Sequence, residues 1–195
     1  MDLSSVFENS CLYSEKDNVK TWRIEGETPS NINKFKNWLI SELESTSIDH
    51  LTVYANNSGT HDEVIFHRLE LVPLKGITPT TFTLRKRNFS NDIVYVMSDE
   101  LEPKGIAMEG LVLFIMLPGS VVDLEATSSI GKGKSHAKWS SVWTTFGTVT
   151  HVKNTNPDCS ACKVDVNQGI GCYYLTIELL GSLTFEDIQE QLDRR

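Results

Sequence analysis

The spacing of apolar residues predicts a helix near each end of the chain. In residues 30–43 the apolar positions recur every three or four residues, which places them on one face of a helix. Residues 185–192 show the same period, and Thr184 with Asp187 fits a capping box at the start of that helix. The two apolar stripes consist of Ile32, Phe35, Trp38, Leu39 and Leu43, and of Phe185, Ile188 and Leu192.

Between these helices the pattern is mainly that of strands. A short helix is expected over residues 62–71, where Pro73 follows its end. Strands are expected at residues 47–55, 81–84, 93–97, 111–117, 121–126, 143–153 and 173–179. Pro118-Gly119 interrupts the strand at 111–117, and we expect residues 121–126 to resume it. This order predicts an α+β fold in which the outer parts of the chain pair and the middle is an insertion.

Composition narrows the classes of partner. The 195 residues carry a net charge of −8, so the chain lacks the basic surplus of a protein that holds nucleic acid by itself. No apolar run of about 18 residues predicts a membrane span, and the first residues lack the basic start of a secretory signal. We therefore expect an intracellular protein whose four cysteines are reduced.

One segment concentrates positive charge in this acidic chain. Residues 130–141 read IGKGKSHAKWSS, with three lysines, one histidine and one tryptophan. We expect Ile130-Gly131-Lys132 to form a turn and the segment to be an exposed loop. Tryptophan beside cationic side chains favours a contact surface over a catalytic pocket.

The candidate chemical motifs are incomplete. Gly133-Lys134-Ser135 lacks the earlier glycine and the following helix of a phosphate-binding loop. His61 and His67 are six residues apart, whereas a zinc protease needs four. Three cysteines, Cys159, Cys162 and Cys172, could bind zinc, but a closed site needs a fourth ligand, and neither His151 nor Cys11 has a convincing spacing. Free thiols in a loop over residues 154–171 are the alternative, and no arrangement predicts a catalytic residue.

Two segments resemble one known family. Residues 62–74, DEVIFHRLELVPL, and residues 130–140, IGKGKSHAKWS, resemble segments of the alpha-like assembly subunits of DNA-directed RNA polymerase. That family includes the third-largest subunit of eukaryotic RNA polymerase II, its archaeal counterpart and the bacterial alpha amino-terminal domain. A weaker third match is residues 174–183, YLTIELLGSL, and the three matches occur in the order of the family.

The resemblance implies a division of the chain and two kinds of interface. Residues 1–45 with 142–195 would form a discontinuous dimerisation subdomain, and residues 46–141 an inserted, strand-rich subdomain. The two helical stripes named above would face a smaller alpha-like subunit in a heterodimer. The interface with the largest and second-largest subunits would include Asp62, Glu63, His67, Arg68, Lys132, Lys134, His136, Lys138 and Trp139.

The resemblance also implies a role without catalysis. The subunit would nucleate assembly of the two large subunits, which carry the catalytic magnesium, and would itself need no cofactor, contact no nucleic acid and touch no membrane. The chain departs from the family in having Lys36-Asn37-Trp38 in the first helix and Ser141 where a proline is usual. Such a compact version suggests a virus-encoded polymerase, acting in a nucleus, the cytoplasm, a viral factory or a virion. Two alternatives stay open, a free-standing scaffold or homodimer of this fold and a small zinc-binding interaction module.

Overall fold

The computed structural model describes residues 10–148 and 171–194, and this part of the chain forms two compact units. Unit 1 consists of the described residues within Met1–Leu43, Ser140–Leu180 and Phe185–Arg195, and unit 2 consists of Glu44–Trp139 and Gly181–Thr184. The boundaries implied by the family resemblance differ from these by two residues at each junction. They also place Gly181–Thr184 in the dimerisation subdomain, whereas these residues belong to unit 2. No helix in the described ranges is long and apolar enough to cross a membrane.

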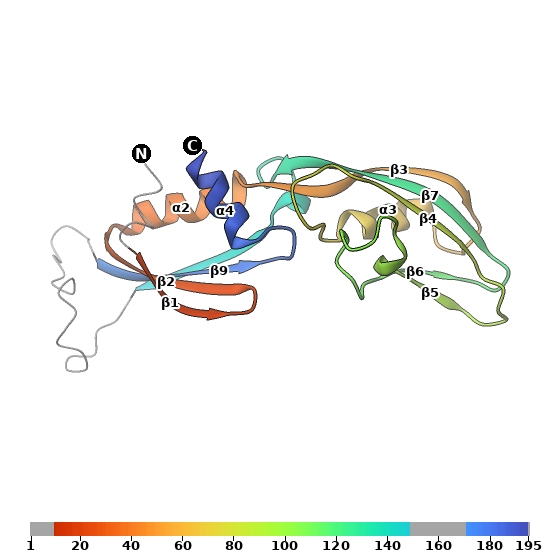
Figure 1. Ribbon diagram of the computed structural model, residues 1–195, viewed down its shortest axis with the longest axis horizontal. Coiled ribbons are helices and arrows are strands. Elements are labelled where there is room, and N and C mark those ends of the chain that lie inside the picture. The colour runs from red at the N-terminus through yellow and green to blue at the C-terminus, as the bar shows by residue number, and fades with distance from the viewer. Residues whose placement is uncertain (1–9, 149–170, 195) are drawn as a thin grey trace. The chain divides into compact units, whose positions relative to one another are not determined.

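Unit 1 is a four-stranded antiparallel sheet with two helices on one face (Figure 1). Its strand order is β1 (Ser10–Lys16), β2 (Val19–Glu27), β9 (Gly171–Leu179) and β8 (Val142–Thr148). The register places Trp22, Leu175 and Phe146 side by side across the sheet. Helix α4 (Phe185–Asp193) contacts Trp22 through Phe185, and helix α2 (Pro29–Ser41) lies over Phe146 through Lys36, so both helices cover this face.

The start of α2 follows from its sequence. Thr28 is the N-cap and its side-chain oxygen accepts a hydrogen bond from the main-chain N–H of Asn31 at 3.2 Å, while Pro29 occupies the first turn. The helix thus begins one residue before the predicted range. The apolar face it buries is the predicted stripe, and Ile32, Phe35 and Leu39 lie in the core of unit 1.

Unit 2 contains two antiparallel sheets with a helix between them. Strands β3 (Glu44–Asn56), β7 (Val121–Lys132) and β4 (Thr81–Arg87) form one sheet in that order, and β5 (Val94–Met97) pairs with β6 (Val112–Met116) in a two-stranded ribbon. Helix α3 (Asp62–Glu70) contacts both β3 and β6. Two single-turn 3₁₀ helices, η1 (Ser98–Glu100) and η2 (Ala137–Trp139), complete the unit.

Alternation along the strands builds the core of unit 2. In β7 every second residue is buried, from Val122 through Leu124 and Ala126 to Ser128. The same face receives Phe82 and Leu84 from β4, Ile65 and Leu69 from α3, and Val96, Phe114 and Met116 from the ribbon. The buried strand residues therefore fix which face of each element points inward.

Three features correct the predicted elements. The β1–β2 hairpin precedes α2, where no strand was predicted, and its turn places Asp17 at a positive φ of 50°. Residues 121–126 do not resume the strand at 111–117, because β7 pairs with β3 and β4 whereas β6 pairs with β5. Ile130-Gly131-Lys132 is not a turn, because β7 runs to Lys132 and these residues pair with Thr46, Ser45 and Glu44 of β3.

The α+β fold with antiparallel sheets is as predicted, and α3, β3, β4 and β9 lie close to their predicted ranges. The predicted strand at 143–153 is described only as β8, Val142–Thr148. The predicted loop at 154–171 falls almost entirely outside the described residues.

Candidate functional site

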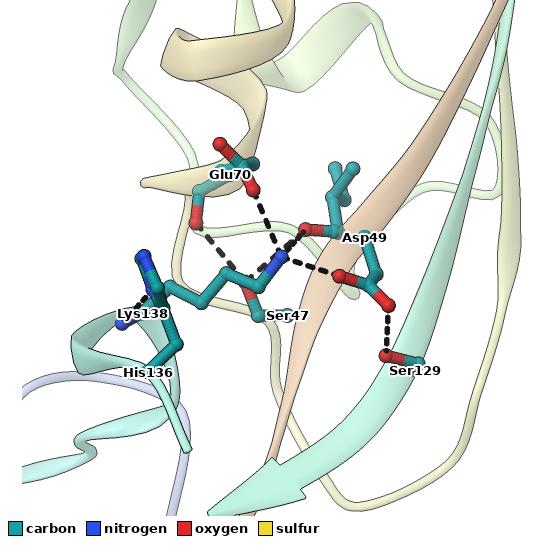
Figure 2. A network of polar contacts seen from close by, with 7 residues as sticks. Ser47, Asp49, Glu70, Ser129, His136 and Lys138 are labelled. Carbon is teal, nitrogen blue, oxygen red and sulfur yellow. Dashed lines mark hydrogen bonds and ion pairs between the residues drawn. The ribbon is translucent and has the colours of Figure 1, made fainter. Parts of the chain in front are cut away.

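A cluster of polar and charged contacts surrounds Lys138 (Figure 2). Its ammonium group lies 2.5 Å from Oδ1 of Asp49 and 2.8 Å from Oε1 of Glu70, and it donates a third hydrogen bond to the main-chain oxygen of Ile48 at 3.3 Å. The Lys138 side chain is only 7% exposed. We call Lys138, Asp49 and Glu70 the ion-pair centre.

A β-bulge places Asp49 in this centre. The register of β3 against β7 passes from Ile48 opposite Ser128 to His50 opposite Thr127, so Asp49 is the additional residue. A bulge bends its strand and re-aims a side chain, and it interrupts the ladder beside it. The Asp49 carboxylate therefore reaches Lys138, and Ser129 donates a hydrogen bond to its other oxygen at 3.0 Å.

The C-terminal end of α3 supplies the second carboxylate. Glu70 is the last residue of the helix, and its main-chain oxygen accepts a hydrogen bond from Ser47 Oγ at 3.0 Å. The Lys138 ammonium group lies beside this helix end, where a positive charge interacts favourably with the helix dipole. One lysine thus joins η2, β3 and α3, so it connects the two sequence segments that carry the family resemblance.

The electrostatics of the centre favour the charged forms. Hydrogen bonding to Lys138 holds the pKa of the Asp49 carboxyl below its ordinary value, against a smaller opposing effect of burial. Burial alone would lower the pKa of Lys138, but hydrogen bonds and charge from Asp49 and Glu70 together outweigh it and raise that pKa above its ordinary value. The pair is therefore ionised at neutral pH.

These shifts predict a pH window for the stabilisation. A lowered Asp49 pKa stabilises the fold above the carboxyl's ordinary value of 3.8, and this contribution is lost as pH falls through the lowered value. A raised Lys138 pKa stabilises the fold below the amine's ordinary value of 10.5, and this contribution is lost as pH rises through the raised value. The free energies of unfolding of the wild type and of Lys138→Met, measured by urea denaturation, should therefore differ most between about pH 5 and pH 9. A difference that stays constant down to pH 3 would contradict this interpretation.

Trp139 is held against the end of β7. Its ring carbon Cδ2 lies 2.2 Å from where a β-carbon on Gly131 would stand, so the indole occupies the space that any other residue would need. The Lys138 ammonium group lies 4.7 Å from the centre of the Trp139 ring, and the His136 ring meets that ring edge-on at 6.4 Å. The main-chain oxygen of Trp139 accepts a hydrogen bond from Ser45 Oγ at 2.7 Å. Trp139 is half-buried, so part of it belongs to the interior of unit 2.

Some of the residues predicted to contact large subunits are engaged in ion pairs of unit 2, and most of the others are exposed. Lys138 is in the ion-pair centre, and Lys132 lies 3.5 Å from the carboxylate of Glu44. Asp62 accepts a hydrogen bond from Asn56 at 2.6 Å but remains exposed. The other exposed members are Glu63, His67, Arg68, Lys134 and His136.

The residues predicted to face a dimer partner are mostly already buried. Six of them are no more than 6% exposed in the core of unit 1, so a partner helix would not reach them without opening that core: Ile32, Phe35, Leu39, Leu43, Ile188 and Leu192. Trp38 and Phe185 are half-buried and remain accessible. The dimer interface itself stays a prediction, now centred on these two side chains.

The zinc prediction falls outside what the structure describes. Cys159 and Cys162 lie outside the described residues, and of Cys172 only the backbone, paired with Glu25, is described. Within the described ranges no three His, Cys, Asp or Glu side chains are grouped closely enough to hold a metal ion. The binding of zinc by these cysteines therefore stays a prediction.

Sequence reasoning missed the two acids of the ion-pair centre. Asp49 had a signal, because Ile48 and Leu51 are three positions apart in a strand whose buried residues should alternate, which is the mark of a bulge. Glu70 had none, since an acid on a predicted surface helix is ordinary. Lys138 was predicted to contact a large subunit, and in the structure its ammonium group pairs with two acids of its own chain.

Comparison with known proteins confirms the resemblance to an RNA polymerase subunit. DNA-directed RNA polymerase subunit Rpo3 of Pyrobaculum islandicum is 26% identical over 157 residues, which cover 70% of this chain and 60% of that protein. Rpo3 of Pyrococcus horikoshii is 28% identical over 72% of this chain and 59% of its own length. Rpo3 of Methanocaldococcus jannaschii is 31% identical over 55% of this chain and 58% of its own length. No family model matches the chain. The chain spans about three fifths of the length of these curated relatives.

Proposed function

We propose that this protein is a non-catalytic assembly subunit of a DNA-directed RNA polymerase. Unit 1 pairs with a smaller alpha-like subunit, and unit 2 contacts the largest and second-largest subunits, so that the heterodimer nucleates their assembly. The observation that carries the proposal is the ion-pair centre, in which Lys138 of one family-like segment binds Glu70 of the other. Relatives named as polymerase subunits support it. The protein then acts wherever that polymerase transcribes, whether in a cell compartment or in a viral factory.

The outer face of α3 supports a contact by unit 2. Val64 and Leu71 are exposed apolar residues seven positions apart, and Arg68 lies between them at helical spacing. An exposed apolar stripe with an arginine is typical of a protein interface. Because the ion-pair centre fixes the C-terminal end of α3, this face is presented on a rigid element.

Unit 1 offers accessible apolar surface for the smaller partner. A groove of about 300 Å³ lies between α4 and the sheet, lined by Trp22, Ile177, Phe185, Glu186, Ile188 and Gln189. On α2 the half-buried Trp38 ring stacks on Phe35 with centroids 6.3 Å apart. An apolar side chain from a partner helix fits such a groove, and Trp38 adds a large contact area beside the buried stripe.

Reversing one charge on α3 tests the contact with the large subunits. Arg68→Glu should reduce the recovery of large subunits with the tagged protein about tenfold, because an arginine at an interface centre commonly contributes about 1–2 kcal/mol or more. The recovery is measured by quantitative mass spectrometry after affinity purification. Arg87→Glu is the matched control, since Arg87 is also exposed in unit 2 but lies on β4.

The two variants separate this contact from loss of folding. Both should keep the thermal midpoint close to that of the wild type, because both arginines are exposed and the charge of Arg68 in the last turn of α3 contributes only about 0.3–1 kcal/mol through the helix dipole. Equal recovery of the large subunits with both variants would exclude α3 as the contact. Recovery of the smaller partner should be unchanged in both, because unit 1 is untouched.

A further inference from the structure

Three consecutive hydroxyl residues lie near the start of β3. Ser45, Thr46 and Ser47 are each no more than 3% exposed, although successive residues of a strand point to opposite faces. Both faces of β3 are therefore covered at this point. A strand buried on both faces ordinarily carries apolar residues, because a buried hydroxyl group without a hydrogen bond is unfavourable. Ser45 meets this requirement by donating to the Trp139 oxygen of η2.

The other two hydroxyl groups hold the segment that ends and follows α3. Ser47 Oγ donates a hydrogen bond to the main-chain oxygen of Glu70 at 3.0 Å (Figure 2), and Thr46 Oγ1 donates one to the main-chain oxygen of Gly76 at 2.9 Å. The Glu70 oxygen is one of the last four carbonyl oxygens of a helix, which lack a partner within the helix. Two neighbouring residues of one strand thus bind both ends of residues 70–76.

The other interactions of α3 restrict its position less directly. Ile65 and Leu69 attach the helix to the core of unit 2 by apolar packing, which has no preferred direction. The ion pair of Lys138 with Glu70 joins two long side chains, each of which has several rotatable bonds. A single torsion places the Ser47 hydroxyl oxygen, and its hydrogen bond reaches the main chain of the helix itself. Ser47 therefore limits the position of the helix end most directly.

We propose that Ser47 and Thr46 are positioning residues for the contact between α3 and a large polymerase subunit. The inference rests on the proposed function, because it concerns the same exposed face of α3. Arg68 lies two positions before Glu70 and Leu71 lies one position after it, so a shift of the helix end moves both exposed side chains. Side chains that anchor an interface fit closely packed pockets, so this shift weakens the contact.

Removing one hydroxyl group from the full-length chain tests the inference. Ser47→Ala should lower the recovery of large subunits with the tagged protein about fivefold, because the two sites are coupled through α3. Ser128→Ala is the matched control, since Ser128 is also buried in unit 2 and its hydroxyl group donates to the main-chain oxygen of Thr80 at 3.1 Å. That hydroxyl group also accepts a hydrogen bond from the Thr80 N–H at 2.8 Å. The control should therefore lower the thermal midpoint at least as much as Ser47→Ala and leave recovery unchanged.

Two further comparisons separate positioning from stability. Thr46→Val removes the hydroxyl group and nearly keeps the shape of the side chain, whereas Thr46→Ser keeps the hydroxyl group. Recovery of the large subunits should fall with valine and stay near the wild-type value with serine. In the Arg68→Glu background, Ser47→Ala should lower recovery little further, because both substitutions act on one contact. Effects of these two substitutions that add in free energy would overturn the inference.

Hydrogen exchange in the purified full-length chain distinguishes the inference from the proposed function. The Val72 N–H donates to Leu69 O at 3.1 Å across the end of α3, and Ser47→Ala should speed its exchange whereas Ser128→Ala should not. Equal exchange at Val72, or equal recovery of large subunits, in these two variants would overturn the inference. Faster exchange in Ser47→Ala alone, with no large subunits recovered even by the wild type, would instead count against the proposed function.

Discussion

Replacing Lys138 with methionine is expected to lower the free energy of unfolding by about 3 kcal/mol. Methionine keeps the unbranched apolar part of the side chain but removes the charge that Asp49 and Glu70 share. Removing one partner of a buried ion pair leaves the remaining charge desolvated and typically costs about 3–5 kcal/mol. The value expected here lies at the lower end because the Asp49 and Glu70 side chains are 45% and 20% exposed, so water partly solvates them.

A second lysine in an ion pair provides the control for this prediction. Lys104 lies 3.3 Å from the Glu102 carboxylate, and both side chains are exposed. Lys104→Met should therefore change the free energy of unfolding by less than about 0.5 kcal/mol. Urea denaturation at pH 7 measures both variants. Equal stability of the two would show that the ion-pair centre does not hold η2, β3 and α3 together.

Replacing Gly131 with alanine is expected to destabilise unit 2 by about 3 kcal/mol, the upper end of the range for overpacking. The new β-carbon would stand 2.2 Å and 2.3 Å from two carbons of the Trp139 ring, and a rigid ring cannot give way as a flexible side chain can. The indole must therefore leave its place beside β7. Near-ultraviolet circular dichroism reports the tryptophan environment, and urea denaturation gives the change in stability.

Two further variants decide whether the collision is the cause. Gly147→Ala is a matched control, because Gly147 also lies in a strand and a β-carbon there would meet no atom within 4 Å. Trp139→Ala should make Gly131→Ala nearly neutral, since the space is then open, and a double-mutant cycle measures that coupling. Additive effects of the two substitutions would mean that Gly131 is required for another reason.

Periodicity was sufficient for the elements with one buried face. The stripe of Ile32, Phe35 and Leu39 predicted α2, and the alternation in β4 and β9 predicted strands. The β1–β2 hairpin escaped this reasoning because six of the seven residues of β1 are exposed, so the strand has no apolar alternation. Its position depends on pairing with β2, which in turn pairs with β9, about 150 residues away in the sequence. Such long-range pairing leaves no local signal.

The candidate site was predictable in its location and not in its contacts. The two family-like segments indicated that Lys138 and α3 matter, but a lysine in a polar segment is ordinarily expected to face water. The bulge at Asp49 turns a carboxylate toward it, and the end of α3 at Glu70 supplies another, so the side chain is enclosed by its own chain. The Lys138 side chain points inward because η2, β3 and α3 pack together in the folded unit, and the sequence alone does not reveal this packing.

The most direct test of the central claim is the mass and composition of the complex that contains this protein. The tagged full-length chain is purified from cells that produce it and analysed by native mass spectrometry, in which each component is identified. The proposal predicts one copy of this chain with one smaller alpha-like subunit and two large polymerase subunits. A monomer or homodimer of this chain without polymerase subunits would contradict it.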